Sequence, residues 1–158
     1  MVEEADRRLR VRRPHVAPLV VIGLGYNSLW QRRRRNFDHW ARRFDRKARG
    51  LLATLRRLGA RQFVWITLRE PNARTVPPRA RGELWRYSWY FPWVNERLHR
   101  LDRQRRDLVL ADWAAVSRSP HHTYDSIHTT PLGARVFSRT INRAIAREAA
   151  RQSRKRRR

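Results

Sequence analysis

Two residues that could share one proton-transfer task stand near the C-terminus. Asp125 precedes His128 by three residues, in a loop that leads into an amphipathic segment beginning at Thr130 and Pro131. A carboxylate that accepts a hydrogen bond from one imidazole nitrogen leaves the other nitrogen free to take a proton from a nucleophile. The spacing therefore favours His128 as a general base and Asp125 as the residue that orients it. Taken alone, the loop is explained equally well by an aspartate that caps a turn beside a surface histidine.

A second pair of candidate residues follows an apolar run about a hundred positions earlier. Gly25 lets the backbone approach a ligand closely, and Asn27 carries a neutral amide donor. Together they could donate hydrogen bonds to the oxyanion of an acyl-transfer intermediate. An ordinary strand-to-helix turn is the alternative explanation of the same Gly-x-Asn pattern.

Metal binding is the other chemistry that the C-terminal loop offers. Histidine and carboxylate side chains are zinc ligands, and the loop contains His121, His122, Asp125 and His128. Adjacent histidines rarely direct both rings at one ion, so we expect no metal site here. The chain contains no cysteine, which excludes disulfides and thiolate ligands.

The segments that must position these residues alternate between strand and helix patterns. Three apolar runs, at residues 19–24, 62–68 and 107–112, predict strands, the first of them buried on both faces. Helical spacing follows each run: from an N-cap at Asn36 to Gly59, after Pro92, and from Thr130 onward. This alternation predicts an α/β fold with a parallel sheet and helices on its faces. Sites in such sheets form beyond the carboxyl ends of the strands, where Gly25 and the loop of His128 both fall.

The length of 158 residues suits a single domain. We expect residues 1–14 to be a basic, poorly ordered segment, residues 15–150 to form the α/β domain, and residues 151–158 to be a disordered basic tail. Residues 71–82, rich in proline and arginine, predict a loop. No apolar stretch is long enough for a transmembrane segment.

The charge of the chain suggests a different class of function. Its 38 basic and 13 acidic residues leave a formal net charge of +25, and an excess of this size attracts polyanions such as nucleic acid or acidic polymers. Because the arginines recur throughout the helical segments, most are explained by solvated helix faces. A non-enzymatic basic protein that binds polyanions, without sequence preference, nevertheless remains the alternative to an enzyme.

In combination, the two motifs resemble those of the SGNH (GDSL-type) hydrolase family, over residues 20–145. Residues 20–27 are similar to the family's apolar strand followed by Gly-x-Asn-Asp, with Ser28 where the aspartate usually stands. Residues 125–128, with Gly133 after them, are similar to its Asp-x-x-His block before the last helix. Residues 109–113 look like the strand that precedes this block in bacterial members related to cell-wall O-acetylation.

The resemblance implies a function, a fold and roles for the candidate residues. Members are esterases, lipases or acetyl transferases that need no cofactor and fold as a flavodoxin-like three-layer sandwich. Asn27 and Gly25 would stabilise the oxyanion, His128 would be the base and Asp125 its partner. The substrate would be an ester-bearing small molecule or polysaccharide.

The family's nucleophile has no counterpart in this sequence. Its serine lies in a Gly-Asp-Ser motif near the N-terminus, whereas residues 1–24 contain no serine, threonine or cysteine. Ser126 lies between Asp125 and His128, where it cannot serve. We therefore expect the resemblance to cover an N-terminally incomplete fold with little or no esterase activity. The protein would act outside the cytoplasm if a longer native chain carries an export signal, and in the cytoplasm otherwise.

Overall fold

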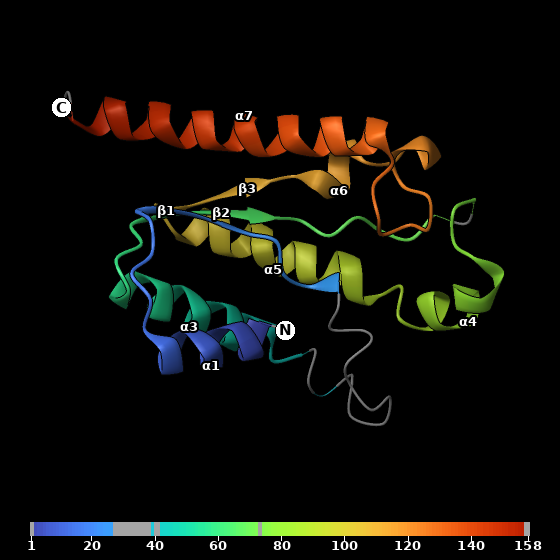
Figure 1. Cartoon of the computed structure of the whole chain (residues 1–158), viewed down its shortest axis with the longest axis horizontal. Helices are drawn as coiled ribbons and strands as arrows, with labels where there is room; N and C mark the ends of the chain where they lie inside the picture. The colour runs from blue at the N-terminus through green and yellow to red at the C-terminus, as the bar shows by residue number, and fades with distance from the viewer. Residues whose placement is uncertain (1, 27–38, 40–41, 73, 157–158) are drawn as a thin grey trace.

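The computed structural model describes residues 2–26, 39, 42–72 and 74–156. Within these residues, helices surround a small sheet (Figure 1). In chain order the elements are α1 (Val2–Arg12), β1 (Leu19–Ile22), α3 (Phe44–Arg57), β2 (Gln62–Ile66), α4 (Pro78–Arg86), α5 (Tyr90–Gln104), β3 (Leu108–Ala111), α6 (Trp113–Val116), the 3-10 turn η3 (Pro120–His122) and α7 (Pro131–Arg156).

The three strands form one parallel sheet in the order β1-β2-β3. Val64 of β2 stands opposite Val21 of β1 on one side and Val109 of β3 on the other. The predicted α/β class and the parallel sheet are therefore confirmed. All three strands end at the same edge of the sheet, so the segments that follow them can meet there.

Side chains of β2 alternate between two apolar cores. Phe63 and Trp65 point to the face covered by α3 and α5, whereas Val64 and Ile66 belong to the core under α7. In Figure 1 helix α7 lies on one side of the sheet and α5, α3 and α1 lie on the other. Burial on both faces explains why β2 reads as a continuous apolar run.

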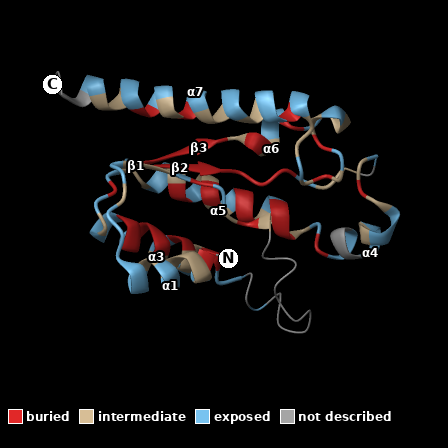
Figure 2. Cartoon of the chain, viewed as in Figure 1, coloured by how far each residue is buried: buried red, intermediate tan, exposed pale blue. Residues whose placement is uncertain are grey.

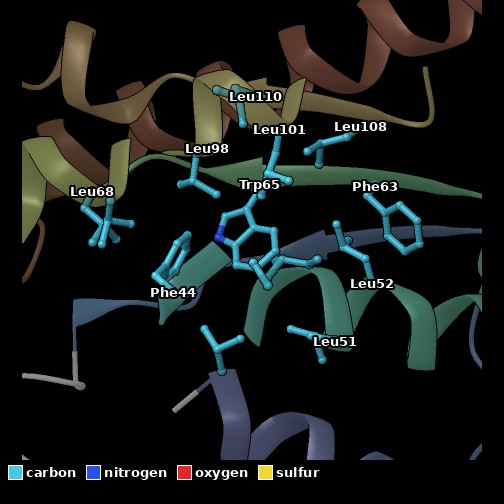
Figure 3. Packing of buried hydrophobic residues seen from close by; sticks show 14 of the residues in the cluster. Phe44, Leu51, Leu52, Phe63, Trp65, Leu68, Leu98, Leu101, Leu108 and Leu110 are labelled. Carbon is cyan, nitrogen blue, oxygen red and sulfur yellow. The ribbon is translucent and has the colours of Figure 1, made fainter. Parts of the chain in front are cut away.

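The larger core is built around Trp65. Its indole lies against the ring of Phe44, with a centroid separation of 6.0 Å, and leucines of α3 and α5 close around it (Figure 3). The indole N–H of Trp65 donates to the carbonyl of Leu24 at 3.4 Å, which ties the segment after β1 to the central strand. The large buried side chains of β2 thus hold the two flanking helices and the end of β1 together.

The smaller core attaches α7 to the sheet. Ala144 is fully buried against Val64, Ile66, Val109 and Ala111. The ring of Phe137 meets Trp113 edge to face at 5.1 Å. These contacts fix the first half of α7 above the carboxyl ends of β2 and β3.

Strand β1 differs from the expectation that it is buried on both faces. Its burial is only partial, and Val21 remains 40% exposed. In the part of the chain that the structure describes, β1 has one strand neighbour, β2, so its side chains receive less cover than those of the central strand. An apolar run alone does not distinguish these two positions in a sheet.

The N-terminal segment also differs from its prediction, because residues 2–12 form helix α1 rather than a poorly ordered stretch. Val2 is buried, and Ala5 and Leu9 pack with it against the larger core. The helix is further supported by an ion pair between Lys47 of α3 and Glu3. The prediction relied on the high charge of this segment and overlooked that Val2, Ala5 and Leu9 lie at helical spacing on one face.

Two other boundaries were predicted wrongly. Helix α7 continues to Arg156, so the stretch expected to be a disordered tail is largely helical. Helix α4 begins at Pro78, inside the expected loop. Pro78 stands in the first turn, where a missing N–H costs nothing, so the prolines here start a helix instead of excluding one. Among the described residues, no helix combines the length and the apolar character needed to cross a bilayer.

The two opposed valines of β1 and β2 offer a matched test of this packing. Val64→Ala removes two methyl groups from a fully buried site and should lower the free energy of unfolding by about 2 kcal/mol. Val21→Ala makes the same change at a position of the edge strand that is 40% exposed, and it should cost about 0.5 kcal/mol or less. Chemical denaturation of both variants measures the difference, and equal losses would contradict the assignment of β2 as the central strand.

Candidate active site

The loop that carries Asp125 and His128 is closed on itself. Thr123 and Thr129 form an antiparallel bridge across it, and the N–H of Tyr124 donates to the carbonyl of His128 at 3.1 Å. The ring of Tyr124 stacks on the His128 imidazole, with centroids 5.7 Å apart. Backbone pairing and ring stacking together restrict the position of His128.

Helix α7 anchors the same loop at its start. Thr130 acts as a cap, because its hydroxyl accepts from the N–H of Gly133 at 3.1 Å and donates to the carbonyl of His121 at 2.6 Å. A Cβ atom on Gly133 would lie 1.8 Å from the carbonyl oxygen of His122. Only glycine therefore lets the chain before the loop pass so closely over the first turn of α7.

Ser126, which the sequence excluded as a nucleophile, is a structural residue of the loop. It is buried, and its hydroxyl bonds the backbone N–H of Asn72 at 3.0 Å and the hydroxyl of Thr75 at 2.8 Å. Its φ of +71° is unusual for a residue with a side chain. The conformation directs the hydroxyl into the loop after β2, away from any role as a nucleophile.

Asp125 and His128 form the contact that the sequence predicted. The Nδ1 atom of His128 lies 2.6 Å from Oδ2 of Asp125, while Oδ1 accepts from the backbone N–H groups of His128 at 2.7 Å and Ile127 at 3.0 Å. Partial burial alone raises the pKa of the Asp125 carboxyl, but the hydrogen bonds from the His128 ring and the two N–H groups outweigh it and lower the pKa. An ionised carboxylate can only accept, so Nδ1 carries a proton, and in the neutral form of the ring Nε2 then has the free lone pair.

The strand ends opposite this loop are held by a buried amide. Asn95 of α5 accepts from the N–H of Leu68 at 2.7 Å and donates to the carbonyl of the same residue at 2.7 Å, as a neighbouring strand would. Leu68 in turn packs on Gly25, whose φ is +151°, and an added Cβ there would come within 2.7 Å of the leucine side chain. Gly25 is therefore required by the close packing of the two strand ends.

Tyr26 joins the segment after β1 to the segment after β2. Its hydroxyl is hydrogen-bonded to the backbone N–H of Arg69, its ring lies 5.9 Å from that of Phe91, and burial raises its pKa. The phenol consequently stays neutral at ordinary pH and acts as a fixed hydrogen-bonding group.

His128 and the end of β1 border one cavity of about 270 Å³. Gly23 and Tyr26 line it from the β1 side, and Ile66 and Leu68 from the β2 side. Ile127, His128, Trp113 and Phe137 complete a mostly apolar wall. The His128 side chain is 64% exposed, so the ring meets both the cavity and solvent. The structure thus brings the predicted base to the end of the predicted strand.

The predicted oxyanion group is placed only in part. Gly25 does not itself line the cavity, although Tyr26 after it and Leu68, on which it packs, do. Asn27 and Ser28 fall outside the described residues, as does the predicted N-cap Asn36. Asp125 and His128 are in contact, as predicted. Of the Gly-x-Asn element, the structure describes Gly25 and Tyr26. The proximity of Asn27 to His128 remains a prediction.

Arg69 was not singled out by the sequence, although it follows β2 at the edge where sites form. It is almost fully buried, burial lowers its pKa, and one guanidinium nitrogen, Nη2, donates to the carbonyl of Ser119 at 3.1 Å. It lines a second cavity of about 520 Å³ together with His99 and Asp112. A charged residue directly after the apolar run of residues 62–68 was the available signal.

Among the described residues, no cluster of histidine and acidic side chains could hold a metal ion.

No protein-family model matches the chain, and none of the curated proteins matches it either.

The lowered pKa of Asp125 predicts a pH-dependent contribution to stability. A carboxyl whose pKa falls on folding stabilises the protein above its unfolded pKa, near 3.8, and that contribution disappears as the pH falls through the lowered value. Asp125→Asn should therefore reduce the free energy of unfolding by about 1 kcal/mol at pH 6 and progressively less below pH 3.8. Denaturation at a series of pH values measures this difference. Glu70→Gln, which neutralises an exposed carboxylate, is the control, and a loss at pH 6 that persists unchanged at low pH would contradict the role given to the charge.

Proposed function

We propose that the protein provides the base side of an SGNH-type ester-hydrolysing or acyl-transferring site, on a flavodoxin-like domain. The contact of 2.6 Å between His128 and Asp125 at the mouth of an apolar cavity carries this proposal. An orienting carboxylate, an exposed imidazole and a small apolar pocket are what acyl-transfer chemistry needs from a base and its acyl-binding site.

The proposed step moves one proton through Nε2 of His128. The nitrogen takes the proton from an attacking hydroxyl as its oxygen bonds to the ester carbonyl carbon, which gives a tetrahedral oxyanion. Asp125 stabilises the imidazolium that forms. When the oxyanion collapses, the bond to the alcohol breaks and Nε2 returns the proton to the departing oxygen.

The cavity is proposed to bind the acyl group of the substrate, and its size favours a small one. Its volume of about 270 Å³ and its lining by Ile66, Leu68 and Phe137 suit an acetyl group or a short chain rather than a long one. The backbone around Gly25 and the amide of Asn27 are proposed to face the oxyanion. No serine lines the cavity among the described residues, so the proposal assigns base and pocket but no nucleophile.

Hydrolysis of p-nitrophenyl acetate tests whether His128 is activated. Without a serine nucleophile the rate should be low, but His128 should supply nearly all of it. Among the described residues, only its ring is both held by a carboxylate and beside the cavity. His128→Ala should therefore lower the protein-dependent rate at least tenfold, and Asp125→Asn should lower it by a smaller factor.

His121→Ala is the matched control, since it removes an exposed histidine from the same loop and should leave the rate unchanged. The chain has six histidines, so a loss of only about one sixth on His128→Ala would mean that all the imidazoles react alike. That result would contradict the proposed function.

A further inference from the structure

A second charged site lies at the opposite edge of the sheet, where β2 and β3 begin. A cavity of about 430 Å³ opens there between the end of α3, the end of α5 and the loops that follow them. Four arginines line it, namely Arg56, Arg61, Arg105 and Arg106, together with two glutamines and a single carboxylate, Asp107. We call this hollow the amino-edge cavity.

The carboxylate of Asp107 fixes two of the four arginines. Arg105 holds it with two nitrogens, Nε at 3.1 Å from Oδ1 and Nη2 at 2.8 Å from Oδ2, and Nη2 of Arg56 lies 2.6 Å from Oδ2. Asp107 is buried, so these contacts place the two guanidinium groups at the wall of the cavity, Arg105 largely covered and Arg56 half exposed. Such preorganisation reduces the entropy that a ligand would have to remove.

The other two arginines, Arg61 and Arg106, are exposed like Arg56, but neither of them forms an ion pair with any carboxylate among the described residues. The side chains lining the cavity therefore carry a net charge of +3, four guanidinium groups less one carboxylate. The C-termini of α3 and α5 at this edge offset about one unit of that charge, since a helix end contributes about half a unit. About two positive charges remain uncompensated in the hollow.

We propose that the amino-edge cavity binds a phosphate or diphosphate group between Arg61, Arg106 and the fixed pair Arg56 and Arg105. A phosphate group carries about two negative charges at neutral pH and matches the planar fork of a guanidinium with two oxygens at once. A single carboxylate would leave one charge unpaired, and an apolar ligand would find no apolar wall. This site is independent of the proposed ester chemistry, because it lies at the other end of the strands.

Calorimetric titration with inorganic pyrophosphate, at constant ionic strength in chloride, tests the site. The wild-type protein should bind one equivalent saturably. The double variant Arg61→Gln/Arg106→Gln should bind at least tenfold more weakly, and it removes none of the bonds that hold Asp107. A nucleoside diphosphate titrated in parallel identifies the source of the group: tighter binding than pyrophosphate assigns a phosphorylated organic ligand, and equal binding assigns the free anion.

The matched control is Arg135→Gln/Arg139→Gln, which removes the same charge from exposed positions on α7 and should change the affinity less than twofold. Equal weakening by the two double variants would overturn the site, because it would show attraction to the diffuse charge of the protein. Failure of the wild-type protein to bind saturably would overturn it as well. His128→Ala should bind pyrophosphate like the wild type, so this result and that of the esterase assay are independent.

Discussion

The fold depends on one strand that is enclosed on all sides. β2 is paired in parallel with β1 and β3, and it carries Phe63 and Trp65 into one core and Val64 into the other. Its ribbon is coloured as buried in Figure 2, and the helices on both faces of the sheet pack against it. Its enclosure fixes the direction in which the chain leaves the sheet. Because protein interiors pack densely, a shift of β2 would disturb the packing of both cores at once.

The buried position of β2 also determines the geometry of the candidate site. Leu68 and Arg69 continue the chain of β2 beyond the sheet. There the side-chain amide of Asn95 bonds the backbone of Leu68, and the hydroxyl of Tyr26 accepts from the backbone N–H of Arg69. The loop of His128 rests on the same segment through Ser126 and on α7 through Thr130. The base and the strand ends are therefore placed by one continuous set of buried contacts.

Local patterns in the sequence predicted the three strands, the start of the last helix and one side-chain contact, but they missed α1 and α4 and failed where tertiary packing decides the outcome. Periodicity identified the three strands and the start of α7 at Pro131, and the three-residue spacing placed Asp125 beside His128. The exposure of Val21 depends on which strand is central in the sheet. The helix formed by residues 2–12 depends on packing against a core whose other residues lie elsewhere in the chain. Likewise, the close approach of His122 to Gly133 follows from the path of a loop that no local pattern specifies.

The central claim is that Asp125 orients His128 so that Nε2 is available as a base, and the ring tautomer tests it most directly. Nitrogen-15 chemical shifts of the neutral His128 ring should show the proton on Nδ1, and Asp125→Ala should abolish that preference while leaving the His121 ring unchanged. A proton on Nε2 in the wild-type protein, or the same mixture of tautomers at His128 and His121, would contradict the account.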